Sequence, residues 1–310
     1  MGRKNYGQMP ITSTFVILQF EIPLFKRSTI QLLRFHFSFF LLPVYLFALS
    51  ILPAVSWKDA TIIFIVLHLL VYPSSNGYNS YMDRDQTPIG GVKNPLAPTK
   101  ELFYVTVAMD VIAVVISCFV SIYFAAGILL YILASRAYSY RGIRIKKFPV
   151  LGYLWVIIFQ GAVIFFITFH GASLNKTLEV PVVPMMAALL LIGGYYPLTQ
   201  VYQFEEDEKD GVTTISMMLG KKGSFIFCGG IFVAATVLMF FTFYNRNQLG
   251  SFYIFLASML PMVAFFLYWM QKVWKDESEA NFKNSLRMNV LASFCTGICF
   301  LTLIILKGFE

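Results

Sequence analysis

Charged residues are scarce in this sequence of 310 residues. Asp, Glu, Lys and Arg together make up only 13% of the chain, whereas 58% of its residues are hydrophobic. An ordinary soluble domain carries about 25% charged residues, so this composition argues against a soluble protein. The surplus of apolar side chains, with 32 Phe and 17 Tyr, predicts an integral membrane protein in contact with membrane lipid.

Cysteine and histidine are also scarce, with four and three residues. All four cysteines fall inside apolar segments, so we interpret them as small buried side chains rather than as disulfide or metal sites. The net charge is +8, but no basic stretch lies on a soluble domain. We therefore expect no nucleic-acid partner and attribute the charge to membrane topology and anionic lipid.

Apolar segments fill most of the chain, and a membrane-spanning helix needs about 20 such residues. The third and fourth segments are separated only near Ala125-Ala126-Gly127. We expect an all-α polytopic membrane protein, a single integral membrane domain over residues 1–310 in which residues 1–30 form a cytoplasmic N-terminal segment. The nine predicted spans are 35–55, 59–79, 102–121, 123–138, 150–170, 180–201, 224–243, 251–271 and 289–307.

The distribution of Lys and Arg predicts the orientation of these spans. If the N-terminus is cytoplasmic and nine spans alternate, 20 of the 24 basic residues fall on the cytoplasmic side. Cytoplasmic loops carry an excess of Lys and Arg in membrane proteins. We therefore expect a cytoplasmic N-terminus, in a bacterial inner membrane. The basic residues on the opposite side are Lys58, Lys176, Arg246 and Lys307.

The first of two acidic clusters follows the second span, on the cytoplasmic side. Asn79 and Asp83 are four residues apart, so on a helix they share one face. Asp85 joins them only if the helix has ended, which Pro88 and Gly90-Gly91 favour. An amide oxygen and carboxylates in this pattern form half of a site for a divalent cation.

The second cluster follows the sixth span, on the same side of the membrane. Gln203 and Asp207 repeat the four-residue spacing, and Glu206 and Asp210 lie one turn apart on a neighbouring face. Carboxylates near hydrocarbon cost about 2.5–3.5 kcal/mol each at a helix centre. Solvated acids at helix ends are the alternative interpretation, but two such clusters on one side favour a shared site.

Two facing half-sites suit a diphosphate held through bridging Mg²⁺. Mg²⁺ prefers oxygen ligands and is usually bound by one or two carboxylates plus substrate phosphate. An aromatic cavity beneath it would hold an isoprenoid tail and stabilise an allylic cation. The sequence thus fits ionisation of a prenyl diphosphate, with the metal ligands Asn79, Asp83, Asp85, Glu206, Asp207 and Asp210.

These motifs resemble those of the UbiA superfamily of intramembrane prenyltransferases. That family has nine helices and the motifs Asn-x-x-x-Asp-x-x-x-Asp and Asp-x-x-x-Asp after its second and sixth helices. Asn79 and Asp83 fill the first two places of the first motif, and Thr87 stands in the third. In the second motif Asp207 fills the last place and Gln203 replaces the earlier aspartate.

Three other stretches are similar to the family. Gly211 and Thr214 match its Asp-x-x-x-Gly-x-x-Thr tail, and residues 93–98 resemble its Arg-Pro-Leu-Pro segment. The loop that contains Tyr138-Ser139 resembles the Tyr-Ser…Lys-x-Lys loop of the chlorophyll synthase branch. The resemblance covers essentially the whole chain and implies a bundle with a central cavity near the cytoplasmic face. It implies the diphosphate-binding residues Arg34, Lys93, Arg141, Arg144 and Lys146.

Our leading hypothesis is a Mg²⁺-dependent prenyltransferase in which Asp83 and Asp207 are essential to catalysis. It would transfer a prenyl group from an isoprenoid diphosphate to a lipophilic or aromatic acceptor. A terpene cyclase on the same scaffold is the alternative. A transporter is disfavoured, because the polar residues gather at one face instead of at mid-membrane.

A few polar residues inside the predicted spans have two interpretations each. Asp110 in the third span is by default a functional candidate, and its rival role is a hydrogen bond in helix packing. Gln160 and Thr199-Gln200 either line the cavity or bridge helices. His68 we interpret as a packed residue rather than a ligand.

Overall fold

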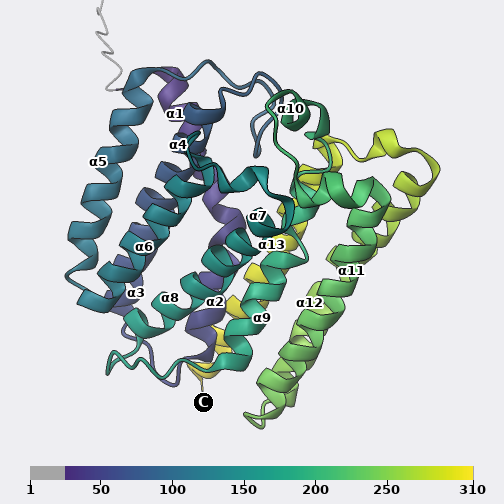
Figure 1. Ribbon diagram of the computed structural model, residues 1–310. Helices are drawn as coiled ribbons and strands as arrows, with labels where there is room; N and C mark the ends of the chain where they lie inside the picture. The colour runs from purple at the N-terminus through teal and green to yellow at the C-terminus, as the bar shows by residue number, and fades with distance from the viewer. Residues whose placement is uncertain (1–24, 310) are drawn as a thin grey trace, which may run out of the picture.

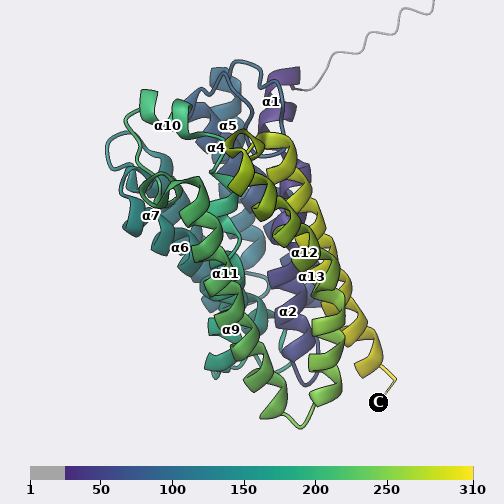
Figure 2. The same cartoon turned by 90° about the vertical axis from the view of Figure 1, so that its right-hand side faces the viewer.

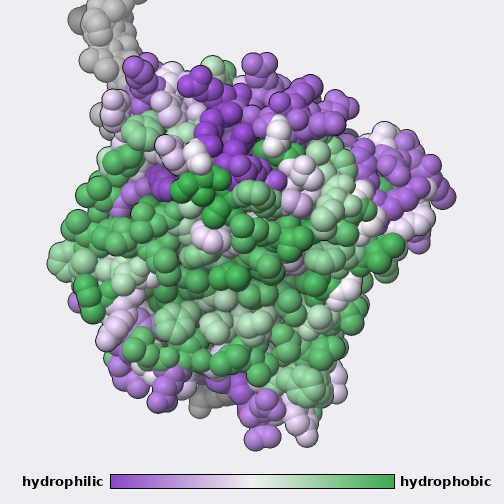
Figure 3. Space-filling model, viewed as in Figure 1, coloured by the Kyte–Doolittle hydropathy of each residue, from purple (hydrophilic) through white to green (hydrophobic). Residues whose placement is uncertain are grey.

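Helices form nearly all of the computed structural model, which describes residues 25–309 (Figure 1). The long helices run roughly alongside one another in two perpendicular views (Figure 2). A broad hydrophobic belt crosses the face shown in Figure 3, and hydrophilic residues gather at the two ends of the bundle. An all-helical bundle with such a belt is the architecture that a bilayer requires, because helices satisfy their own backbone hydrogen bonds.

Eight of the predicted spans form helical segments that are long and apolar enough to cross a membrane in the described part of the chain. Several of them consist of two or three shorter helices joined end to end. Their components are α1 (Arg27–Leu33), η1 (Phe35–Leu41), α2 (Leu42–Ile51), α3 (Trp57–Phe64), η2 (Ile65–Val71), α4 (Tyr72–Asp83), α6 (Ile122–Ser139), α7 (Pro149–Ile157), η4 (Ile158–Val163), α8 (Ile164–Ala172), α9 (Val182–Gly193), η5 (Tyr196–Thr199), α11 (Ile215–Tyr244), α12 (Leu249–Lys275) and α13 (Phe282–Lys307).

The third predicted span differs from these eight in its charge. It corresponds to α5 (Lys100–Ser117), which has 18 residues, among them Lys100, Glu101 and Asp110. Helix α5 packs against α4 and α6 (Figure 1). It therefore completes the predicted bundle, although its 18 residues include three charged side chains.

The boundary between the third and fourth spans lies earlier than predicted. Helix α5 ends at Ser117, and α6 begins after Ser121, whose hydroxyl accepts a hydrogen bond from the Phe124 N–H at 2.9 Å. Ser is a preferred N-cap residue. The prediction of a break near Ala125-Ala126-Gly127 was wrong, because these small residues continue the helix.

Two spans contain π-helical segments that the sequence pattern did not reveal. η2 interrupts the second span just before α4, and η4 interrupts the fifth span between α7 and α8. Such widened turns change which side chains face a neighbour and are frequent at functional sites. In this protein η2 directly precedes α4, and η4 contains Phe159 and Gln160, two residues that line a cavity between the helices.

Short elements collect at one end of the bundle. α10 (Phe204–Lys209) lies there beside the loop that joins α4 to α5, and η3 (Ile145–Lys147) lies near the end of the link from α6 to α7. η6 (Glu277–Glu279) joins α12 to α13. Residues 1–24 lie outside the described residues, so the cytoplasmic segment 1–30 stays a prediction for nearly all of its length.

Candidate functional site

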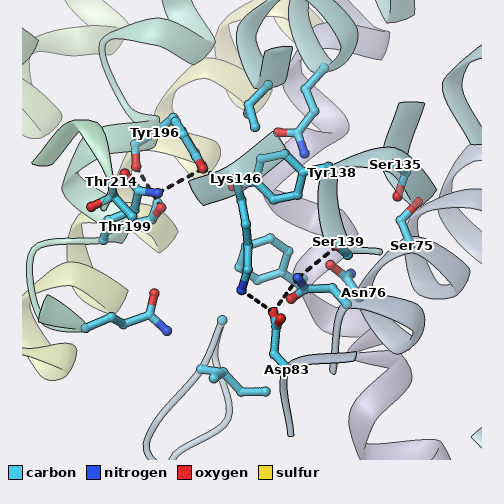
Figure 4. Close-up of a pocket in the computed structure, with 18 of the residues that line it drawn as sticks. Ser75, Asn76, Asp83, Ser135, Tyr138, Ser139, Lys146, Tyr196, Thr199 and Thr214 are labelled. Carbon is cyan, nitrogen blue, oxygen red and sulfur yellow. Dashed lines mark hydrogen bonds and ion pairs between the residues drawn. The ribbon is translucent and has the colours of Figure 1, made fainter. Parts of the chain in front are cut away.

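A cavity opens at the end of the bundle that carries α10 and reaches inward between the helices. Asp83, Asp85 and Asp207 line it at that end, and Tyr131 and Gln160 line it deeper, in the middle of α6 and η4. Figure 4 shows residues from several helices around this space, with Lys146 reaching across to Asp83. The sequence predicted a central cavity in this position.

Helix α4 supplies the largest group of polar side chains. Asn76, Asn79 and Asp83 follow one another at three- and four-residue intervals, so they share a face, and all three line the cavity. The helix ends at Asp83 because Arg84 adopts a left-handed backbone with φ 57°. This turn brings Asp85 off the helix and into the cavity lining.

The Asp83 carboxylate is closely enclosed, with only 4% of its side chain exposed. Its Oδ2 lies 2.7 Å from Lys146 Nζ and accepts a hydrogen bond from Asn79 Nδ2, also at 2.7 Å. Arg144 Nη2 approaches its Oδ1 at 3.8 Å, but that oxygen has no hydrogen-bond partner among the described residues. Asp83 thus keeps one buried oxygen free to bind a ligand.

Arg34 enters the cavity from the junction of α1 and η1. Its backbone is left-handed, with φ 46°, and the residue is only 6% exposed. Its Nη2 donates to the Asn76 carbonyl at 3.1 Å and to Asn79 Oδ1 at 3.4 Å. Gly90 makes room for this side chain, since a Cβ there would lie 2.3 Å from Arg34 Nη1. The loop after α4 therefore covers Arg34 closely.

Asp207 reaches the cavity from α10, and its environment differs from that of Asp83. Burial raises the pKa of Asp207 to about 7, and the neighbouring carboxylates of Asp85, Asp83 and Asp210 add to the shift while Lys146 opposes it. Burial likewise raises the pKa of Asp85 to about 6, with Asp83 the next largest cause. Carboxylates that repel each other in this way favour a bound cation.

Two of the predicted metal ligands take other positions. Asp210 pairs with Arg144 and lies 3.2 Å from Arg141 Nη1. Arg141 also donates to the Met82 carbonyl at 2.8 Å. These contacts join the end of α4 to the end of α10. Glu206 and Asp210 are not among the described residues that line the cavity.

The predicted diphosphate-binding residues also divide into two groups. Arg34 and Lys146 line the cavity. Arg141 and Arg144 are not among the described residues that line it, and both form ion pairs with Asp210. Lys93 is exposed on the loop after α4. Gln203, which replaces a family aspartate, lines the cavity, and its amide donates to the Pro88 carbonyl at 3.5 Å.

A metal ion would need ligands besides those of the protein. Within residues 25–309, no group of three or more His, Cys, Asp or Glu side chains is arranged to hold a metal by itself. Mg²⁺ needs only one or two carboxylates when phosphate oxygens complete its shell. The free oxygen of Asp83 and the repelling carboxylates of Asp85 and Asp207 fit such a cation.

The deeper wall is more polar than the sequence suggested. Tyr138 and Tyr196 share a hydrogen bond, and Gln200 Nε2 donates to the Tyr196 hydroxyl at 2.9 Å. Asn76 could have been found from its spacing to Asn79, whereas no motif pointed to Asn289. The lining residues that sequence reasoning missed include Ser75, Asn76, Tyr131, Ser135, Trp155 and Asn289.

Asp110 has a packing role instead of a place in the cavity. Arg136 Nε donates to its Oδ2 at 3.0 Å, and the Ser74 hydroxyl donates to its Oδ1 at 2.6 Å. His68 is likewise buried among neighbouring helices, with Nδ1 3.2 Å from the Ser38 carbonyl oxygen. Of the two interpretations of Asp110, the structure supports helix packing.

Residues 38–291 match the family model of the UbiA prenyltransferase family, which is most of the chain. The chain belongs to the UbiA prenyltransferase family. The recognition made from the two acidic motifs is thereby confirmed, and the protein is an intramembrane enzyme of prenyl-diphosphate chemistry. No individual curated protein matches the sequence significantly.

Solved structures confirm that this UbiA protein has the family's fold. A UbiA homologue from Archaeoglobus fulgidus, bound to GPP and Mg²⁺, superimposes with a TM-score of 0.65 at 19% identity, over 89% of this chain and 99% of that one. The apo UbiA homologue from Aeropyrum pernix K1 has a TM-score of 0.64 at 19% identity, over 86% and 97%. A digeranylgeranylglyceryl phosphate synthase has a TM-score of 0.57 at 19% identity, over 90% and 96%.

Proposed function

We propose that this protein transfers a prenyl group from an isoprenoid diphosphate to a lipophilic acceptor and that the reaction depends on Mg²⁺. One observation carries the proposal. Asn79, Asp83 and Asp85, from the end of α4, line the same cavity as Asp207 from α10. Two acidic motifs 124 positions apart in sequence at Asp83 and Asp207 thus meet at one opening.

The acidic residues would hold the cation that carries the diphosphate. We assign Mg²⁺ to Asp83, Asp85 and Asp207, with Asn79 as a neutral neighbour, and bound Mg²⁺ would neutralise the charge of the leaving diphosphate. The UbiA homologue bound to GPP and Mg²⁺ supports this assignment through its shared fold. Asp83 and Asp207 are then essential because each occupies the cavity from a different element.

The basic residues near the site would have two different roles in binding the diphosphate. Lys146 and Arg34 line the cavity and would contact phosphate oxygens directly, since charge-assisted hydrogen bonds are the stronger kind. Arg141 and Arg144 would position the acidic end of α10 through Asp210. Lys93 stays a candidate contact from the loop after α4.

Transfer to an acceptor explains the inner wall better than cyclisation does. A cyclase must shield its carbocation from nucleophiles, and an apolar aromatic wall serves that purpose. Here the wall includes the amides of Gln160, Gln200 and Asn289 among the tyrosines. Such groups suit a polar second substrate, so we favour transfer and keep the cyclase as the alternative.

Turnover by the purified protein tests the proposal. With a prenyl diphosphate, Mg²⁺ and a membrane lipid extract, the wild type should release diphosphate and form a prenylated lipid. Asp83→Ala and Asp207→Ala should abolish release while the protein still inserts, and Glu208→Ala, at an exposed position of the same α10, should leave it unchanged.

Each other outcome has a definite meaning. Full activity in both aspartate variants would contradict the assignment of the cation site. A hydrocarbon or terpene alcohol formed from the diphosphate alone would identify a cyclase instead.

A further inference from the structure

We infer that the acceptor is an uncharged molecule with a hydroxyl group, and that Gln160 and Asn289 bind that group. The inference rests on the proposed prenyl transfer and names the chemical class of its second substrate. It comes from how charge is distributed along the cavity and from one buried amide oxygen that has no hydrogen-bond partner among the described residues.

Charge is confined to the open end of the cavity. Both cations of the lining are already engaged there, because Lys146 contacts Asp83 and Arg34 contacts Asn76 and Asn79. A bound diphosphate would also form ion pairs with these two side chains. Among residues 25–309, the charged side chains of the cavity lining are Arg34, Asp83, Asp85, Lys146 and Asp207.

The deeper part of the lining is polar but uncharged. A carboxylate placed there would lose its hydration without gaining a cation, which is unfavourable in a low-dielectric site. A neutral hydroxyl can satisfy both its donor and its acceptor against amides and other hydroxyls. The uncharged polar residues of this deeper lining include Tyr131, Gln160, Gln200 and Asn289.

Asn289 gives this preference a specific position. It lines the cavity from α13 and is only 5% exposed, yet its Oδ1 has no hydrogen-bond partner in the described part of the chain. Its backbone carbonyl accepts a hydrogen bond from the Tyr195 hydroxyl at 3.1 Å, which fixes this turn of α13. A buried amide left unpaired is costly, so a ligand hydroxyl that pairs with it would be bound favourably.

Gln160 supplies a second amide from another helix. It lies in the π-helical segment η4 and lines the same cavity as Tyr131 of α6. An amide both donates and accepts, whereas a carboxylate ligand only accepts. Two amides from separate helices therefore favour a hydroxyl over an acid group.

The bond changes balance without any further reactant. The allylic C–O bond of the prenyl diphosphate breaks, and its electron pair leaves with the diphosphate. The allylic carbon then forms a bond to the acceptor's hydroxyl oxygen, or to an electron-rich carbon beside it. The proton displaced from the acceptor leaves with the diphosphate. Gln160 and Asn289 orient the hydroxyl during these steps.

A fractionated extract tests the class of the acceptor. Lipids from membranes of the source organism are separated by anion exchange into neutral and acidic fractions, and each is incubated with the purified protein, Mg²⁺ and labelled geranyl diphosphate. We expect label in a hydroxyl-bearing lipid of the neutral fraction. Label transferred mainly to the acidic fraction would overturn the inference but leave the proposed transfer standing.

The remaining outcomes concern the proposed function itself. Diphosphate release without label in either fraction, or no release at all, would refute prenyl transfer and with it the inference. These results are distinguishable from transfer to an acidic lipid, because only that transfer places label in the acidic fraction.

Variants test the two amides separately from folding. With a neutral acceptor, Asn289→Leu and Gln160→Leu should each raise the acceptor KM at least fivefold, with the KM for geranyl diphosphate unchanged. Asn289→Gln should recover part of the loss. Thr296→Val is a matched control on α13, since that hydroxyl bonds to the Ala292 carbonyl of its own helix. An unchanged acceptor KM in both leucine variants would overturn the assignment.

Discussion

At the scale of single residues, two aspartates of the same cavity have opposite environments. Asp83 is surrounded by Lys146, Asn79 and Arg144. Asp207 is buried beside other carboxylates, which raises its pKa to about 7. Its proton and a metal ion therefore compete for the same oxygens near neutral pH.

This competition predicts the pH dependence of cation binding. The folded-state pKa of Asp207 is raised, so its carboxylate is mostly protonated at pH 6 and mostly ionised at pH 8. The Mg²⁺ affinity of the wild type, measured by calorimetry with a non-hydrolysable prenyl diphosphate analogue, should rise about tenfold between these pH values. Asp85, with its pKa raised to about 6, adds to the trend at the acidic end.

Asp207→Asn is the control for the pH effect. Its Mg²⁺ affinity should be weak and should change much less between pH 6 and 8. An unaltered pH profile in this variant would show that another group is responsible.

Several residues of the site were predictable because they follow short-range rules. Asn79 and Asp83 share a helix face by their spacing, and Asp85 joins them once the turn at Arg84 ends α4. Asn289 and Tyr131 were not predictable, because their place in the cavity depends on how distant helices pack. Polar residues of this kind carry no local signal in a single sequence.

At the scale of elements, α4 is held from two sides. Its cavity face carries Asn79 and Asp83, and its other face carries Ser74 and Tyr78. Arg136 of α6 donates to the Ser74 hydroxyl at 2.9 Å and stacks over the Tyr78 ring at 3.9 Å from the centroid. Together with Asp110 of α5, these contacts fix the rotation of α4 and hence the direction of its site residues.

Removing Asp110 should therefore weaken the bundle and the site together. Asp110→Ala leaves Arg136 without its ion-pair partner in a mostly buried position, which costs about 3 kcal/mol. We expect a lower midpoint of thermal unfolding in detergent and a reduced affinity for prenyl diphosphate. Asp59→Ala removes the ion pair with Lys176, between the start of the second span and the loop after α8, and should leave that affinity unchanged. Equal effects of the two variants would contradict a special role for Asp110.

The close approach of Gly90, in the loop after α4, to Arg34 leads to a second prediction at this scale. Gly90→Ala would place a Cβ 2.3 Å from Arg34 Nη1, so the guanidinium must move. We expect the KM for prenyl diphosphate to rise roughly tenfold, the loss of one charge-assisted contact.

Gly230→Ala is the matched control for Gly90→Ala. No described atom outside its own helical turn lies within 4 Å of a Cβ at Gly230, so this substitution should leave the KM unchanged. An unchanged KM for prenyl diphosphate in Gly90→Ala would contradict this prediction, because it would show that the loop moves and leaves Arg34 in place.

At the scale of the whole molecule, the sequence predicted the number and order of the spans well. Apolar stretches separated by polar loops are sufficient for this, because an apolar stretch of about 20 residues can cross the bilayer as a helix that satisfies its own backbone hydrogen bonds. The interruptions inside the spans were not predictable. The π-helical segments η2 and η4 lie within continuous apolar stretches, and their wider turns depend on packing against neighbouring helices.

The proposed orientation can be tested on intact cells. Cys118 is exposed, so it is first replaced by serine, while the other three cysteines are buried. Single cysteines at the exposed positions Lys93 and Lys58 then report on opposite ends of the bundle. A membrane-impermeant maleimide should label Lys58→Cys from outside and reach Lys93→Cys only after the cells are opened. The reverse pattern would invert the orientation.

The central claim is that the acidic ends of α4 and α10 jointly bind a metal–diphosphate complex at one cavity. The most direct test is equilibrium binding of labelled geranyl diphosphate to the purified protein at increasing Mg²⁺ concentration. The account predicts saturable binding that requires Mg²⁺ and is lost in both Asp83→Ala and Asp207→Ala. Binding that persists without Mg²⁺, or in either variant, would contradict it.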